Sequence, residues 1–128
     1  MGNLEERGSW IGVDLDGTLA YYDDTYVVGQ IGSVIEPMKR LVLDFIDKGY
    51  EVKIFTARVY SGSYAGRAND VQKNYLAIKQ WLKENGLPDL EITCVKDYMM
   101  VELYDDRAVQ VEKNTGKLLG QSTLRQGI

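Results

Sequence analysis

Short apolar segments alternate with amphipathic helical segments along most of this chain. Apolar residues recur at helical spacing between Glu36 and Lys48, and a second such stripe follows Asn69, which suits a helix cap. Runs typical of strands occupy residues 10–14, 51–56, 91–95, 101–104 and 108–112. Neighbouring parallel strands need long crossover connections, which such helices provide. The alternation predicts an α/β fold, a three-layer Rossmann-like sandwich with a mostly parallel five-stranded sheet.

The length of 128 residues matches a single domain, which we expect to span 1–128 with a core at about 9–119. Cys94 has no partner cysteine, so no internal disulfide forms. The net charge of −4 excludes a global positive field that would hold nucleic acid non-specifically. The N-terminal residues lack a signal-peptide pattern, and no apolar run reaches the roughly 20 residues of a membrane span. We therefore expect a cytoplasmic protein without membrane contact.

Polar side chains follow the predicted strands where these end. In an open parallel sheet the carboxyl ends of the strands line one crevice, so residues far apart in the chain converge there. Clustered carboxylates repel one another unless a cation is present, and oxygen ligands without His or Cys suit Mg²⁺. A magnesium site is therefore expected at this edge of the sheet. The residues expected there are Asp14, Asp16, Thr56, Lys96, Asp105 and Asp106.

The chain contains no histidine, which narrows the chemistry of such a site. Zinc hydrolysis and histidine-based general-base catalysis are both disfavoured, so a carboxylate has to carry the acid–base work. A carboxylate nucleophile beside Mg²⁺, a lysine and a threonine hydroxyl fits phosphoryl transfer through an aspartyl-phosphate.

Four segments, in chain order, resemble the motifs of the haloacid dehalogenase-like (HAD) phosphohydrolase superfamily. Asp14–Thr18 reads Asp-Leu-Asp-Gly-Thr and is similar to the first motif, D-x-D-G-T. Phe55–Arg58 resembles the second motif, Lys96 the third, and Tyr104–Asp106 the fourth. The resemblance covers residues from about 10 to 110, and it implies a sheet with the strand order 5-4-1-2-3 and no cap domain.

The resemblance implies a Mg²⁺-dependent phosphomonoester hydrolase, an enzyme in which Asp14 attacks phosphorus. Asp16 would then be the general acid and base, and its presence separates phosphatase-like members from true dehalogenases. Thr56 and Lys96 would hold the phosphoryl oxygens. The implied metal ligands are Asp14, Asp16 through its main-chain carbonyl, Asp105, and Asp106 directly or through water.

The spacing of the motifs leaves no room for the cap domain that many family members use on small metabolites. Asp16 and Thr56 are 40 positions apart, as are Thr56 and Lys96, and one helix with its loops fills each interval. We expect an open site, covered at most by residues 20–32 or by the 59–68 loop. Such a site suits a nucleotide, the terminal phosphate of a nucleic acid or another large phosphorylated molecule.

Other residues near the motifs have two interpretations each. Arg58, a candidate substrate-binding residue, and Arg107 either bind a second phosphate or pair with the neighbouring acids. The tyrosines of the 20–32 segment either stack on a base or pack the loop onto the domain.

Two other classes of protein use similar residues and are alternatives to such an enzyme. A phosphorylatable receiver domain uses similar residues, but its acid pair lies on the first strand and its phosphorylated aspartate on the third. The reversed order in this chain disfavours that class. A non-catalytic regulatory or binding module that keeps a Mg²⁺ and phosphate site remains the alternative. The natural substrate and the oligomeric state are not indicated by the residues.

Overall fold

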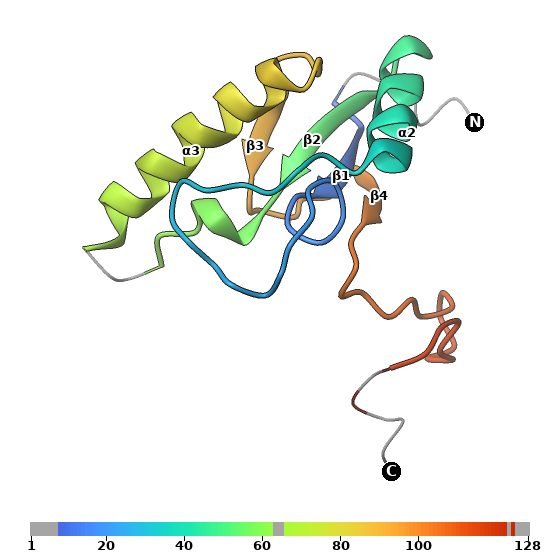
Figure 1. Cartoon of the computed structure of the whole chain (residues 1–128). Coiled ribbons are helices and arrows are strands. Elements are labelled where there is room, and N and C mark those ends of the chain that lie inside the picture. The colour runs from blue at the N-terminus through green and yellow to red at the C-terminus, as the bar shows by residue number, and fades with distance from the viewer. Residues whose placement is uncertain (1–7, 63–65, 123, 125–128) are drawn as a thin grey trace.

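The computed structural model describes residues 8–62, 66–122 and 124 (Figure 1). The elements are β1 (Trp10–Asp14), α2 (Glu36–Asp47), β2 (Glu51–Phe55), the 3₁₀ helix η1 (Ala57–Val59), α3 (Arg67–Glu84), β3 (Glu91–Thr93) and β4 (Met100–Tyr104). α3 begins two residues before Asn69, so Asn69 lies inside the helix and does not cap it. None of the helices in the described part of the chain is long and apolar enough to cross a membrane.

The four strands form one parallel sheet in the order β3-β2-β1-β4. This is the expected order for the first four strands of the chain. β1 lies at the centre, because the crossover through α2 leads to β2 on one side and the 94–99 connection leads to β4 on the other. The sheet has four strands among the described residues, so the prediction of five is wrong.

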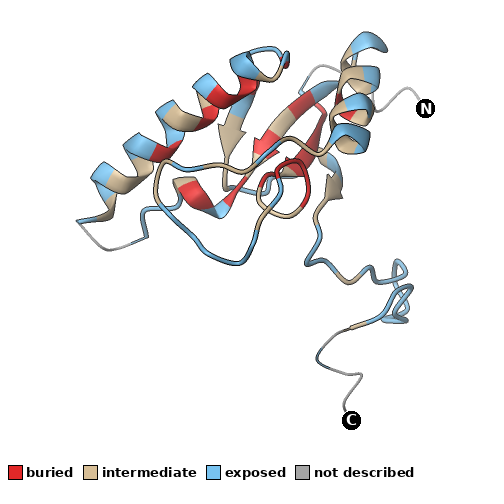
Figure 2. Ribbon diagram, in the orientation of Figure 1, coloured by how far each residue is buried: buried red, intermediate tan, exposed pale blue. Residues whose placement is uncertain are grey.

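The segment expected to form the fifth strand, residues 108–112, pairs with the residues just after it. The main-chain N–H of Glu112 donates to Lys117 and that of Leu119 to Gln110, both at 2.8 Å. The turn between them has positive φ at Asn114 and Gly116, as expected for a tight Asn-Thr-Gly turn. Local turn chemistry thus joins 108–112 to its own hairpin, and the chain leaves the sheet beyond β4 as a largely exposed tail (Figure 2).

Both helices pack on the same face of the sheet. The two crossovers, β1 to β2 and β2 to β3, run in the same direction, and right-handed connections then place α2 and α3 on one side. The 94–99 connection is too short for a crossover helix, and it covers the other face, where Asp97 accepts a hydrogen bond from Trp10 Nε1. The described residues therefore form two layers and not the three predicted. The core includes Ile11, Val13, Val42, Val52, Ile54, Ile78 and Leu82.

The strand ends that carry the predicted site lie at one edge of the sheet. Asp14, the last residue of β1, is in register with Phe55, the last residue of β2. Tyr104, the last residue of β4, is in register with Val13 of β1. The segments that follow these three strands therefore start side by side.

Candidate functional site

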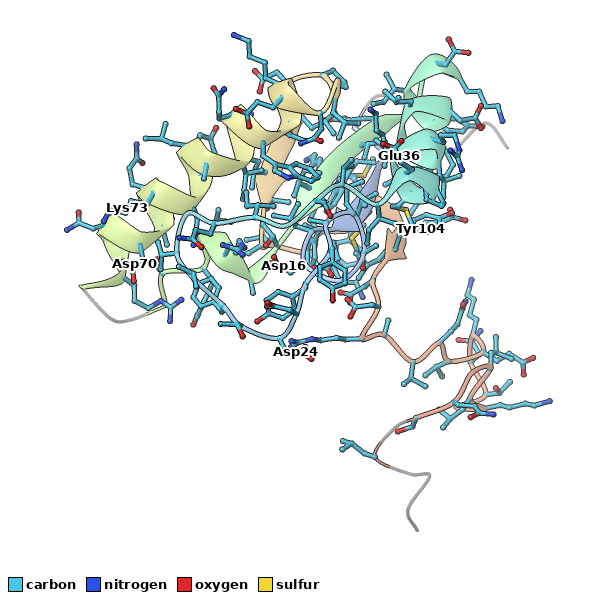
Figure 3. The ribbon with its side chains drawn as sticks, in the orientation of Figure 1. Asp16, Asp24, Glu36, Asp70, Lys73 and Tyr104 are labelled. Atoms are coloured by element: carbon cyan, nitrogen blue, oxygen red, sulfur yellow. The ribbon has the colours of Figure 1, made fainter. Side chains whose placement is uncertain are left out.

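A cavity of about 330 Å³ opens where β1, β2 and β4 end. Its walls come from these strand ends, from the 20–32 loop and from the first residue of α3. Figure 3 shows Asp16 between the strand ends and the loop that carries Asp24. The parallel sheet thus brings together residues from distant parts of the chain. The expected site residues that line the cavity are Asp14, Asp16, Thr56, Arg58 and Asp105.

Three carboxylates, which we call the acid cluster, lie close together, and two of them, Asp14 and Asp105, line this cavity. One oxygen of each of Asp14, Asp105 and Asp106 lies within 4.8 Å of the others. The Thr18 hydroxyl is 3.2 Å from both Asp14 Oδ2 and Asp106 Oδ1, and it accepts a hydrogen bond from the main-chain N–H of Asp106. A hydroxyl has one proton, so Thr18 donates to only one of the two carboxylates at a time.

The negative charge of the acid cluster is not balanced within the described part of the chain. None of its three members forms a salt bridge with a described residue. Burial, a hydrogen bond with the Asp106 carboxyl and the charge of Asp105 together raise the pKa of Asp14 to about 7, against the opposing hydrogen bond from Thr18. A cation bound here would relieve the repulsion that contributes to this shift.

The composition of the acid cluster suits a hard divalent cation. Carboxylate oxygens without nitrogen or sulfur ligands are typical of Mg²⁺ and Ca²⁺ sites. Asp14, Asp105 and Asp106 would hold such an ion. The carboxylate of Asp16 is not part of the cluster.

Gly17 allows the turn after β1 to approach the acid cluster. Its φ is +90°, a conformation that residues with a side chain rarely adopt. A Cβ at this position would lie 2.6 Å from Asp106 Oδ2, which is closer than real Cβ contacts. A side chain at this position is therefore disfavoured by the turn and would displace the Asp106 carboxylate.

Asp16 also lines the cavity, where it is paired with Arg58. Arg58 Nε donates to Asp16 Oδ2 at 2.7 Å, and Nη2 donates to Asp16 Oδ1 at 3.0 Å. The side chains are 4% and 19% exposed for Arg58 and Asp16, so the two-pronged ion pair is largely shielded from water. This pair fixes the orientation of the Asp16 carboxylate.

The remaining donors of Arg58 hold the 20–32 loop. Nη1 donates to the carbonyl of Val27 and to Asn74 Oδ1, and Nη2 donates to the carbonyl of Gln30. A guanidinium has five N–H donors, and all five of Arg58 are used within the chain. Arg58 therefore has no donor left for a substrate, which differs from the substrate-binding role expected for it.

Asn74 of α3, fully buried, completes this arrangement, which we call the Arg58 network. Its Oδ1 accepts from Arg58 and from the main-chain N–H of Gly29, and its Nδ2 donates to the Tyr26 hydroxyl and to the carbonyl of Arg58. The network ties the loop to α3 and η1. The Tyr26 ring lies against the Arg58 guanidinium, 5.0 Å from centroid to Cζ. Tyr26 thus packs the 20–32 loop against Arg58 and Asn74, which is one of the two roles expected for the tyrosines of this loop.

Thr56 and Lys96 have different positions relative to the cavity. Thr56 is buried at the cavity wall, and its hydroxyl accepts the main-chain N–H of Arg58 at 3.2 Å. Lys96 is exposed and lines a separate hollow beside β4, with Met100 and Tyr104. The structure does not bring Lys96 to the cavity. The reason is that Lys96 belongs to the 94–99 connection, which runs along the face of the sheet opposite the helices to the start of β4.

The sequence interpretation left out two residues of the site. Thr18 belongs to the first motif, but the motif alone assigns it no role in the site, and no motif contains Asn74. Asn74 falls on the stripe of Val71, Ile78 and Trp81 that α3 turns toward the protein. A polar residue on an apolar helix stripe signals a buried hydrogen-bonding group, and this signal was present in the sequence.

Comparisons with protein-family models, with curated proteins and with solved structures found no match to this chain.

Proposed function

We propose that this chain is a Mg²⁺-dependent phosphomonoester hydrolase of the HAD-like type that acts through an aspartyl-phosphate on Asp14. The observation that carries the proposal is the acid cluster at the cavity, with its unbalanced charge and its Asp14 carboxyl at the end of the central strand. Three of the four segments that resemble the family's motifs contribute residues to the cavity, and the strand order supports the same assignment.

The proposed reaction has two displacements at phosphorus. A carboxylate oxygen of Asp14 forms a bond to phosphorus while the ester bond breaks, and the leaving oxygen takes a proton from Asp16. Water then attacks phosphorus, Asp16 takes the proton of that water, and the bond to Asp14 breaks. Mg²⁺ held by the acid cluster would supply positive charge against the phosphoryl oxygens.

Arg58 is the positioning residue for Asp16 in this proposal. It orients the carboxylate through both oxygens, and each oxygen keeps a second lone pair that can hold the transferred proton. The Thr56 hydroxyl at the cavity wall is the group placed to contact a phosphoryl oxygen. Lys96 has no part in the proposed machinery, since it lies on another surface.

The test compares Asp14→Asn with the wild type, using p-nitrophenyl phosphate in the presence of Mg²⁺. We expect a fall in kcat of at least about 10³-fold, because an amide cannot act as the nucleophile. The matched control is Asp47→Asn, an exposed aspartate at the end of α2 that lies outside the cavity. Equal rates for wild type and Asp14→Asn would contradict the mechanism.

A binding module without turnover gives a different result in the same experiment. Such a protein would bind Mg²⁺ and phosphate, and the acid-cluster variants would lose this binding, but no phosphomonoester would be hydrolysed above the rate of the buffer. Titration of phosphate in a calorimeter, with and without Mg²⁺, separates this outcome from an inactive preparation.

A further inference from the structure

Three arginines border the cavity, and they differ in how their donors are used. All five N–H groups of Arg58 bond within the chain. Arg67, the first residue of α3, and Arg107, which follows the acid pair, also line the cavity. Neither of these two guanidiniums forms a salt bridge or a side-chain hydrogen bond with a described residue. They are the unbalanced positive charges of the site.

The Nε atom of Arg67 carries the strongest part of this observation. It is buried and has no hydrogen-bond partner among the described residues. A buried donor without an acceptor is costly, and native proteins keep few such groups. The guanidinium of Arg67, a residue that lines the cavity, therefore has hydrogen-bonding capacity that the described residues do not use.

The chemistry of the acceptor follows from the two donors. A guanidinium presents a planar fork of N–H groups that matches the oxygens of a phosphate. The cavity of about 330 Å³ lies at the small end of the range for small-molecule sites, about 300–1,000 Å³. Arg67, Arg107 and Asp14 therefore border a space that one small ligand can fill. The acid cluster accounts for a cation and the reacting group, so the arginines are available for a second anion.

We propose that Arg67 and Arg107 bind a second phosphate group of the substrate, and that the preferred substrates carry two phosphates, such as a nucleoside bisphosphate. The inference rests on the proposed hydrolase function and adds the class of substrate. Tyr22 also lines the cavity.

The kinetic test compares adenosine 3′,5′-bisphosphate with adenosine 3′-monophosphate and adenosine 5′-monophosphate, all with Mg²⁺. We expect kcat/KM for the bisphosphate to exceed that of the better monophosphate by about 10–100-fold. In Arg67→Gln and in Arg107→Gln, made separately, this ratio falls by about tenfold. The control is Arg40→Gln, an exposed arginine of α2 outside the cavity, which leaves the ratio unchanged.

Two results overturn the inference while leaving the hydrolase function intact. One is equal kcat/KM for the bisphosphate and a monophosphate in the wild type. The other is a bisphosphate preference that neither arginine variant reduces.

A binding measurement separates failure of the inference from failure of the proposed function. If no phosphomonoester is hydrolysed, the hydrolase proposal fails, and the same ligands are titrated into the wild type and the Arg67→Gln variant in a calorimeter with Mg²⁺. Binding of the bisphosphate at least about tenfold tighter than of either monophosphate, lost in Arg67→Gln, supports the second phosphate site. Equal affinities overturn it.

Discussion

The acid cluster and the Arg58 network border the same cavity, but their charges are balanced in different ways. In the Arg58 network every donor of the guanidinium has an acceptor within the chain, and the Asp16 charge has its partner. In the acid cluster three carboxylates have no cation from the described residues, and the pKa of Asp14 rises to about 7. Charges that are balanced inside the chain hold the 20–32 loop in place, whereas unbalanced charges are available to a ligand.

The difference predicts opposite responses to mutation. Removing a member of the balanced network leaves its partners without bonds in a buried place, so it destabilises the fold. Removing a charge from the acid cluster relieves repulsion, so it stabilises the metal-free fold while it weakens ligand binding.

The largest effect is expected for Arg58→Met. The variant leaves the Asp16 charge without its cation, leaves two loop carbonyls without their Arg58 donors and removes one of the two donors to Asn74 Oδ1. We expect the free energy of unfolding to fall by about 3–5 kcal/mol. Urea unfolding measures this change, with Arg40→Met as the exposed control on α2. A loss below about 1 kcal/mol would show that the Arg58 network does not support the fold.

The second effect is stabilisation of the wild type by Mg²⁺. Protein treated with EDTA should melt at a higher temperature when Mg²⁺ is added, because the ion binds only the folded acid cluster. At 100 times the dissociation constant the gain is about 2.7 kcal/mol, or roughly 10 °C for a chain of this size. Differential scanning calorimetry checks the shift. No shift at millimolar Mg²⁺ would contradict a magnesium site.

The third effect distinguishes two roles of a glycine by a pair of variants. Gly17 and Gly49 have the same φ of +90°. A Cβ added at Gly17 would lie 2.6 Å from Asp106 Oδ2, whereas a Cβ added at Gly49 would have no atom within 4 Å. Alanine at either position costs about 1–2 kcal/mol through the backbone. Only Gly17→Ala should also weaken Mg²⁺ binding, by at least about tenfold, because it displaces Asp106. Calorimetric titration measures the affinities, and equal affinities in both variants would exclude this role of Gly17.

The smallest effect is the pH dependence of the acid cluster in EDTA. Unfolded Asp14 releases its proton near 3.8, while the folded residue keeps it up to about 7. The folded state binds more protons in this window, so this group's contribution to stability decreases as the pH rises from about 4 to about 7.

Asp14→Asn removes this titration. After allowing for the partial exposure of Asp14, we expect the variant to exceed the wild type by about 1 kcal/mol at pH 8, with a smaller difference at pH 5. Urea unfolding at both pH values gives the two differences. A difference that is independent of pH would contradict the raised pKa.

The parts of the site that could be predicted are those that lie at strand ends. Asp14, Thr56 and Asp105 follow or end apolar runs of strand type, and parallel strands bring their carboxyl ends to one edge. Arg58 was recognised as a site residue, but its use of every donor inside the chain depends on the carbonyls of Val27 and Gln30. Loop carbonyls carry no sequence signal, because every residue has one.

The expected fifth strand also could not be placed from the sequence. The alternating pattern at 108–112 indicates that these residues can form a strand, but it does not indicate which segment they pair with. The Asn-Thr-Gly turn at 114–116 joins this segment to residues only a few positions ahead, so the nearby pairing replaces one with β4.

The sequence by itself determined the parallel sheet, the two helices and the edge at which the acids gather, while the strand order was implied by the resemblance of its motifs to a known family. The first three features depend on periodicity and on the rule that parallel strands end at one edge, which are local or general rules. Only the tertiary structure decided which charges are balanced. The charge of Arg58 is balanced by Asp16. The acid cluster and the guanidiniums of Arg67 and Arg107 have no oppositely charged partner among the described residues. Charge balance depends on distances of a few ångströms between segments far apart in the chain, and these distances exist only after folding.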